Sequence, residues 1–484
     1  MCWSTILVSL SEVCLLSWSL LYIYKTADCK LPWSHQSNVS AGSSAAEYYV
    51  HNVLRLSPDL NSFGNIGGDI LLATVITWVI VAVCLSAGIR KTGRLCYAIA
   101  PLILVATVVL FIQGCLLWDS RVSAALSPDW VHLTVPQTWL AASVYVYHSL
   151  NLGRGGLTTI GSFNKEHTNL IRDVGLLCLV HFAWGITLWL TFVCFTLGNG
   201  LQLEPYAGPW LLFVSVAKGL AALPHGVPFA LLTYSLVFIS GLSTLAGNIL
   251  MVISSVLAIF PRLQSQRSAV TATTCLGIFL LGIPLTSQIG LHLYWLLIHY
   301  AVSWVPVLHG LCVVLVVALC YGHVQFVADL GYSSGIYLKE WVARHLIVVY
   351  SSLLPILLLV LLASTLHIAS HFPTRQSTYP DWGVALGWLL TALPLFVLLF
   401  SGAAYKLLYF LKKHSFRKSL MLLVKPDEMW IHNTFRTGSR VSEKTTMTHP
   451  VIIAACKEYD NNNLSSYIDR NLQHGDREQD SFDL

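Results

Sequence analysis

Long stretches without a charged side chain are the feature that most constrains this chain. Residues 70–89, 95–118 and 268–328 contain no Asp, Glu, Lys or Arg. A helix needs about 20 mainly apolar residues to cross the hydrocarbon core of a bilayer. Only 11% of all residues are charged, whereas soluble domains carry about 25%. These runs therefore predict an all-α polytopic membrane protein.

About ten membrane-spanning helices are expected. Residues 1–24 are interpreted as the first span and not as a cleaved leader, because no basic segment precedes them. A short turn is expected near 290–299, between two spans. The predicted spans are residues 1–24, 70–89, 95–118, 130–153, 174–203, 219–261, two within 268–328, 345–374 and 382–405.

The orientation follows from the basic residues in short loops, which favour the cytoplasmic side. Lys and Arg gather at 88–94, 163–172 and 259–268, and again after residue 405. We therefore expect a multi-pass protein of the plasma membrane with both termini in the cytoplasm. Asn38 begins an Asn-Val-Ser acceptor in an outer loop, which predicts a glycoprotein.

The composition changes near residue 413. Residues 1–412 are predicted to form the transmembrane domain, whereas 413–484 are polar and charged and predict a mostly disordered cytoplasmic tail. The final Phe482, Asp483 and Leu484 could add a strand to a PDZ-type partner.

Residues 149–156, SLNLGRGG, interrupt an apolar span with three glycines. Glycine weakens a helix by about 1 kcal/mol relative to alanine. Unpaired backbone at membrane depth is tolerated only against protein or a watery cavity. The segment favours either a transporter binding site at a broken helix or a close contact between helices. From the glycine cluster, two half-helices are expected within 140–165, separated near 151–155.

Several polar side chains lie inside predicted spans. Glu12 is the only charge in the first 24 residues, and Arg154 lies in the glycine segment. A charge within a span indicates function by default, although Glu12 could also be protonated or shielded by an oligomer contact. His181 suits a core histidine or a ligand. Ser243 and Thr244 suit ion binding or hydrogen bonds within their own helix. The cysteines show no metal-binding spacing.

Short motifs in a fixed order carry a resemblance to a known family. They are LPW at 31–33, GIRKTGR at 88–94, PDW at 128–130, SLNLGRGGL at 149–157, SFN at 162–164, LLGIPL at 280–285, YG at 321–322, YPDWG at 379–383 and LGWL at 386–389. With this spacing, residues 5–412 resemble the sodium:neurotransmitter symporter family of solute carriers. The resemblance implies the inverted-repeat fold of the bacterial leucine transporter.

The resemblance also implies an incomplete fold. Residues 1–24 are similar to the family's third helix, and its first helix, with an NxWRFPY-like stretch, has no counterpart in this sequence. That helix supplies ligands for sodium and substrate in the family. Its absence leaves two explanations, a truncated product or a protein that has lost sodium-coupled transport.

Site residues follow from the family's positions. The substrate-facing candidates are Glu12, His148, Asn151, Gly153, Arg154 and Asn248. The sodium-ligand candidates are Ser149, His181, Ser243 and Thr244. Tyr145 and Gly185 fall where chloride ligands would lie, so chloride dependence is expected to be lost. No cofactor is expected. A sodium ion is possible, but the few oxygens left predict that it does not bind with useful affinity.

Two functions are therefore weighed. The first is a divergent sodium-coupled symporter for an amino-acid-like or amine-like solute, impaired by the loss of two helices. The second is a non-transporting membrane scaffold or regulatory partner. Neither is an enzyme. The expected partners are the solute and the lipid bilayer, with no nucleic acid, and the oligomeric state stays open.

Finally, Glu12 and Arg154 are predicted to form an ion pair in the central cavity.

Overall fold

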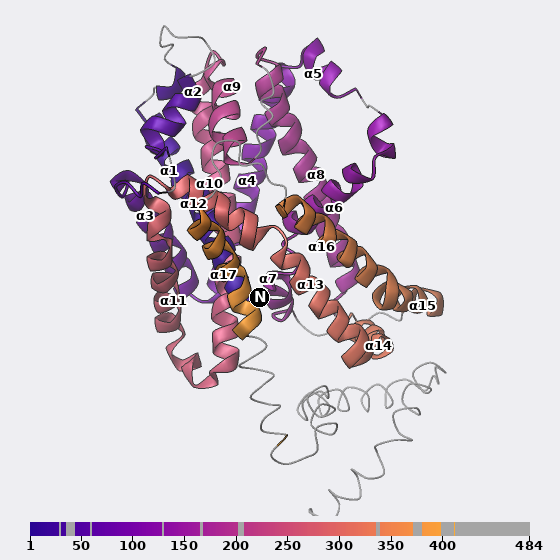
Figure 1. Cartoon of the computed structure of the whole chain (residues 1–484). Coiled ribbons are helices and arrows are strands. Elements are labelled where there is room, and N and C mark those ends of the chain that lie inside the picture. The colour runs from indigo at the N-terminus through magenta and orange to yellow at the C-terminus, as the bar shows by residue number, and fades with distance from the viewer. Residues whose placement is uncertain are drawn as a thin grey trace, which may run out of the picture. The chain divides into compact units, whose positions relative to one another are not determined.

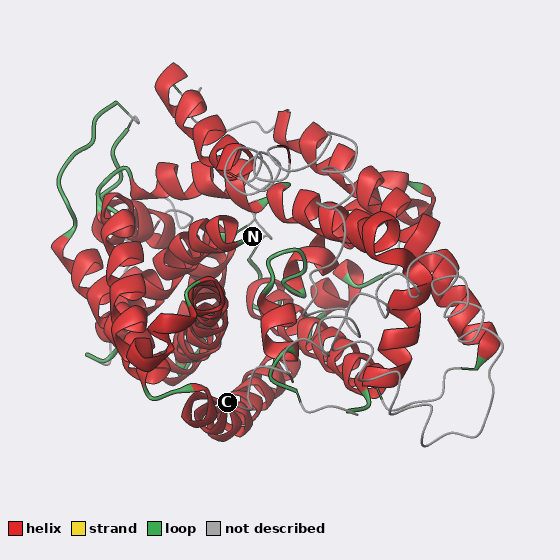
Figure 2. Ribbon diagram, turned by 90° about the horizontal axis from the view of Figure 1, so that it is seen from below, coloured by secondary structure: helices red, strands yellow, loops and turns green. Residues whose placement is uncertain are grey.

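The computed structural model describes residues 1–28, 31–34, 44–58, 61–127, 130–164, 168–201, 208–334, 339–370, 380–397 and 411. These residues form helices and loops and no β-strand (Figure 2). Asn38 and residues 413–484 lie outside the described ranges, so the predicted glycosylation, tail and PDZ-type ending stay predictions.

Seventeen α-helices occur in the described residues. They are α1 (Cys2–Thr26), α2 (Ser44–Glu47), α3 (Gly68–Ser86), α4 (Ile89–Leu116), α5 (Ser120–Ala125), α6 (Pro136–Ser149), α7 (Gly156–Gly161), α8 (Leu170–Leu197), α9 (Ala217–Ala221), α10 (Gly226–Ile259), α11 (Arg267–Gly282), α12 (Gly290–Leu297), α13 (Val305–Leu315), α14 (His323–Ser333), α15 (Glu340–Val348), α16 (Leu354–Ser370) and α17 (Asp381–Val397). Short π-helical or 3₁₀ turns join several of them, at Pro32–Ser34, Tyr48–Val53, Trp130–Thr134, Leu211–Val216, Pro261–Gln266, Ile283–Thr286, Ile298–Val302, Val316–Gly322 and Val349–Leu353.

Eight helical stretches among the described residues are long and apolar enough to cross a membrane. They are Cys2–Thr26, Gly68–Ser86, Lys91–Leu116, Leu170–Leu197, Gly226–Ile259, Pro261–Thr286, Gly290–Gly331 and Glu340–His367. Of the other two predicted spans, 130–153 contains α6 and 382–405 overlaps α17, which has 17 residues. The protein is therefore a multi-pass membrane protein.

The turn predicted near 290–299 lies at a different position in the structure. Residues 290–297 form α12, and the chain turns instead at Ser287–Ile289 and bends at Ser303 and Trp304. Residues 290–299 contain one glycine and no charged residue, so the sequence has no clear turn residues there. The apolar run alone does not tell a short helix from a connecting turn.

The chain divides into two compact units. The first comprises Met1–Asn164, Arg172–Leu311 and Leu358–Leu398, and it holds every candidate site residue that the structure describes. The second comprises Lys165–Ile171, Cys312–Leu357 and Leu399–Leu484. Within its described residues, Tyr321 donates a hydrogen bond to Asp329, and Arg344 pairs with Glu340 at 3.0 Å.

Helix α1 runs through the core of the first unit and packs along α10 (Figure 1). It contains several serines, which would be costly in an apolar interior if they lacked partners. Ser9, Ser17 and Ser19 each donate at 2.8 Å to the carbonyl oxygen four residues earlier. These local bonds allow a serine-rich helix to be buried.

Aromatic side chains hold one end of α1 against its neighbours. Trp18, Tyr22 and Trp33 are almost fully buried together with Phe213 and Tyr234. The Tyr22 hydroxyl donates to the Phe213 carbonyl at 3.0 Å, and the Trp33 indole donates to a backbone carbonyl at 2.9 Å. Buried Tyr and Trp need such partners, so the LPW segment is part of this packing.

Candidate functional site

The glycine segment breaks the helix as predicted. α6 ends at Ser149 and α7 begins at Gly156. Between them, Asn151 (φ +57°), Gly153 (φ +69°) and Gly155 (φ +86°) all have left-handed backbone. L-residues rarely adopt this conformation, and glycine adopts it without steric cost. The prediction of two half-helices within 140–165 is confirmed.

Neighbouring elements satisfy the backbone where the helix is interrupted. The Thr5 hydroxyl in α1 donates to the Arg154 carbonyl at 3.0 Å. Beside the break, the Tyr147 hydroxyl donates to the Pro306 carbonyl at 3.0 Å, and a Cβ on Gly153 would collide with that carbonyl oxygen. The break is thus held between the start of α1 and the start of α13.

A chain of amide and carboxylate groups links the break to α10 and α1. Asn151 Nδ2 donates to Asn248 Oδ1 at 3.1 Å, and Asn248 Nδ2 donates to Glu12 Oε2 at 2.9 Å. Asn248 is 0% exposed, and Glu12 is half-buried. Three of the predicted substrate-facing residues therefore meet at one place. A buried polar group without a partner would cost about 1–3 kcal/mol. These hydrogen bonds therefore stabilise the contact between the break, α10 and α1.

The predicted ion pair between Glu12 and Arg154 is wrong. Both residues are described, and no nitrogen–oxygen distance between them is 4.0 Å or less. The Asn248 amide already donates to the Glu12 carboxylate, while the Thr5 hydroxyl holds the Arg154 backbone. The two charges share a region, but a neutral asparagine takes the place expected for the guanidinium.

Arg154 is enclosed with its side chain unpaired. It is 7% exposed, and its Nε has no hydrogen-bond partner among the residues that the structure describes. Its guanidinium lies within electrostatic reach of Glu12, Tyr147 and His148. The His148 ring packs edge-on against Tyr147, with 5.9 Å between ring centroids. Arg154 and His148 therefore lie in the same polar region as the asparagine chain.

Sequence reasoning missed Thr5, Tyr147 and Pro306 as parts of this site. Thr5 and Tyr147 make the hydrogen bonds that support the break, and Pro306 supplies a carbonyl acceptor. Only Tyr147 carried a signal, since it lies two residues before the interrupted segment. A threonine in an apolar helix and a proline carbonyl have no pattern that marks them.

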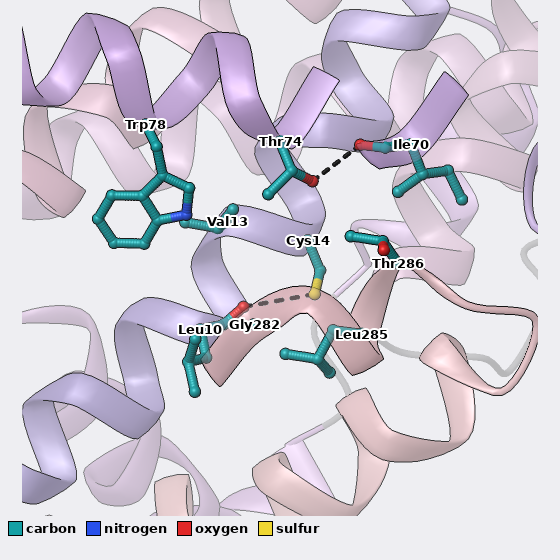
Figure 3. A pocket seen from close by; sticks show the side chains of 9 residues that line it. All are labelled: Leu10, Val13, Cys14, Ile70, Thr74, Trp78, Gly282, Leu285 and Thr286. Atoms are coloured by element: carbon teal, nitrogen blue, oxygen red, sulfur yellow. Dashed lines mark hydrogen bonds between the residues drawn. The ribbon is translucent and has the colours of Figure 1, made fainter. Parts of the chain in front are cut away.

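Two cavities lie away from the break. One lies between α1, α3 and the end of α11, and Figure 3 shows Cys14, Thr74 and Leu285 around it. Its volume is about 10 Å³, room for one water molecule at most. The Thr74 hydroxyl donates to Ile70 and the Cys14 thiol to Leu10 within their own helices. This cavity is a packing gap and not a ligand site.

The second cavity is an open cleft of about 450 Å³ lined by Lys25, Tyr48, His51, Arg55 and Asp69, among others. Arg55 pairs with Asp69 at 3.0 Å, with both side chains more than half exposed. Such a surface pair contributes about 0–1 kcal/mol. Burial raises the pKa of Tyr48 to about 12, so its hydroxyl stays neutral. The cleft is therefore a polar surface feature remote from the break.

Comparison with known proteins identifies the family of this chain. The sequence profile of the sodium:neurotransmitter symporter family matches residues 1–409. This chain belongs to that family. The resemblance inferred from the short motifs is confirmed.

Relatives of this symporter-family chain are distant. It is 25% identical over 418 residues to a creatine transporter of Torpedo marmorata, covering 78% of this chain and 67% of the relative. It is 25% identical over 409 residues to sodium- and chloride-dependent glycine transporter 2 of Xenopus laevis, covering 82% of this chain and 51% of the relative. It is 26% identical over 460 residues to sodium- and chloride-dependent GABA transporter 2 of Rattus norvegicus, covering 87% and 75%.

The fold has a counterpart among solved structures. The crystal structure of MhsT in complex with L-phenylalanine superposes with a TM-score of 0.60 at 19% identity, covering 75% of this chain and 79% of that one. This likeness supports the expected transporter fold with one broken helix.

The sodium-ligand candidates of this symporter-family chain form two separate pairs. His181 Nε2 lies 2.9 Å from Ser149 Oγ. Ser243 donates to the Ile239 carbonyl at 3.1 Å, and Thr244 donates to the Ser240 carbonyl at 3.3 Å, both within α10. No hydrogen bond joins the two pairs, all four members of which are described.

Each of the four candidates already makes a hydrogen bond with a protein group. Hard cations are bound by several oxygens together, whereas His181 offers a nitrogen and the other three candidates offer one hydroxyl oxygen each. The described residues also contain no cluster of three His, Cys, Asp or Glu able to hold a metal. Tyr145, at a chloride-ligand position, is 66% exposed. Weak sodium binding and loss of chloride dependence stay predictions.

Proposed function

We propose that this family member moves a small amino-acid-like or amine-like solute across the membrane by alternating access. The broken α6–α7 helix, joined to α10 and α1 through Asn151, Asn248 and Glu12, carries the proposal. A helix interrupted beside buried polar groups is the usual setting of a transporter's binding site. The creatine, glycine and GABA named for its relatives each carry a carboxylate and a basic nitrogen, and they define the solutes to test first.

The proposal includes residence in the plasma membrane with both termini in the cytoplasm. The basic residues Lys91 and Arg94 at the start of α4 support this orientation. Sodium coupling is proposed to be weak, because His181 offers a nitrogen where hard cations prefer oxygen, and Ser149, Ser243 and Thr244 supply only three hydroxyl oxygens. The PDZ-type partner and the Asn38 glycan are part of the same proposal for a cell-surface protein.

Radiolabelled uptake tests this function. Cells expressing the chain are given labelled glycine, GABA or creatine in sodium buffer and in N-methylglucamine buffer, and surface protein is measured by biotinylation. We expect uptake above that of control cells and its loss in Asn248→Leu, which removes the link between α10 and the break. Gly175→Ala is the matched control, because nothing lies within 4 Å of the added methyl group.

The rival function is a non-transporting scaffold. It draws on the same contacts, because Asn248 bonds to both Glu12 and Asn151 without a solute. Normal surface expression without uptake of any of the three solutes, in either buffer, would contradict transport and favour the scaffold.

A further inference from the structure

Arg154 has hydrogen-bonding capacity that the protein does not use. Its side chain makes no hydrogen bond or ion pair with any other described residue, it is 7% exposed, and its Nε is buried without a partner. In the same break, Asn151 Oδ1 is a buried acceptor without a partner. One unused cationic donor and one unused acceptor therefore lie within four residues of each other along the chain.

Two groups near Arg154 already make other hydrogen bonds. Glu12 accepts from Asn248, and the Tyr147 hydroxyl donates to Pro306. A guanidinium cannot lose its charge in a protein, so Arg154 does not escape the cost of burial by becoming neutral. A charged residue inside a membrane span indicates a functional site by default, so we look for its partner in a bound ligand.

We infer that Arg154 is the receptor for a carboxylate of the transported solute, which its guanidinium binds directly, without an intervening sodium ion. This inference rests on the proposed transport function and narrows its substrate class. The planar guanidinium fork matches a carboxylate with two parallel hydrogen bonds. The fixed charge of the guanidinium can supply by itself the positive charge that the carboxylate requires.

The unused acceptor indicates the other end of the solute. Asn151 Oδ1 can accept a hydrogen bond from an ammonium or guanidinium group, and Asn151 is joined to the Glu12 carboxyl group through Asn248. The solute class is therefore a zwitterion with a carboxylate and a basic nitrogen, and an amine without a carboxylate is excluded.

Binding to the purified full-length chain in detergent tests the inference. The probes are glycine and GABA and their counterparts without the carboxylate, methylamine and propylamine. Dissociation constants come from thermal-shift titrations in sodium-free N-methylglucamine buffer and in sodium buffer. We expect at least one of the two carboxylate probes to bind without sodium and neither amine to bind.

Substitutions of Arg154 test whether its guanidinium is the group that binds the carboxylate. Arg154→Gln should raise the dissociation constant by about 30-fold or more, as expected for loss of a buried charged partner. Arg154→Lys keeps the charge without the fork and should fall between wild type and Arg154→Gln. Arg94→Gln, which removes an exposed arginine from a predicted loop, is the matched control and should bind as wild type.

Several results would overturn the inference. They are equal binding of the amine and carboxylate probes, carboxylate binding only with sodium, binding of neither carboxylate probe, or wild-type binding by Arg154→Gln. If Arg154→Gln does not fold, the comparison of glycine with methylamine on wild-type protein decides. Uptake that survives Arg154→Gln contradicts the inference and leaves transport standing. Arg154-dependent binding without uptake supports the inference and contradicts transport.

Discussion

Gly153 provides a sharp test of how the helix break is held. An alanine at this position would need left-handed backbone at φ +69° and would press its Cβ against the Pro306 carbonyl oxygen and the Tyr147 hydroxyl. The left-handed conformation costs an L-residue about 1–2 kcal/mol, and overpacking a filled site costs about 1–3 kcal/mol. Together these terms predict that Gly153→Ala loses about 2–5 kcal/mol of unfolding free energy.

The assay is unfolding of purified protein in mixed micelles by a denaturing detergent, followed by tryptophan fluorescence. Gly175→Ala is the control, because Gly175 lies within α8 with nothing near its Cβ position. It should gain up to about 1 kcal/mol from the better helix propensity of alanine. Tyr147→Phe isolates the hydrogen bond to Pro306 and should lose about 0.5–1.5 kcal/mol. Equal stability of Gly153→Ala and Gly175→Ala would refute this account of the break.

Four further predictions concern three single contacts and the response to sodium. Asn248→Leu leaves the Glu12 carboxylate without its donor and should destabilise the protein by about 1–3 kcal/mol, measured in the same unfolding assay; an unchanged midpoint would argue against the polar chain. Replacing potassium with sodium should leave the melting temperature of wild type unchanged, and a sodium-specific rise would contradict the prediction of weak sodium binding. His181→Ala should cost about 1 kcal/mol by removing the partner of the Ser149 hydroxyl, and stability equal to wild type would show that this contact contributes nothing. Trp33→Phe should lose about 0.5–1.5 kcal/mol with its buried indole hydrogen bond, seen as a shift in the unfolding midpoint, and no shift would mean that the bond is not needed for packing.

Local rules account for what the sequence alone determined. A charge-free run long enough to cross a bilayer must form a helix in lipid, because its backbone groups have no other partners there. The runs 70–89 and 95–118 therefore predicted α3 and α4 closely. The glycines at 153 and 155 likewise predicted the break, since the left-handed conformations found there are properties of individual residues. Ordered short motifs also revealed the family.

Pairing between distant residues was decided only by the tertiary structure. Glu12 and Asn248 are 236 positions apart, and Asn151 and Asn248 are 97 apart. The sequence placed Glu12 and Arg154 in one region, and the cost of buried charge suggested that they pair. Which donor reaches a carboxylate, however, depends on helix rotation and packing to within about 1 Å, because hydrogen bonds form only over a narrow range of distances. Periodicity and composition contain no information at that scale, so the asparagine bound to Glu12 and the unpaired Arg154 emerged only from the folded chain.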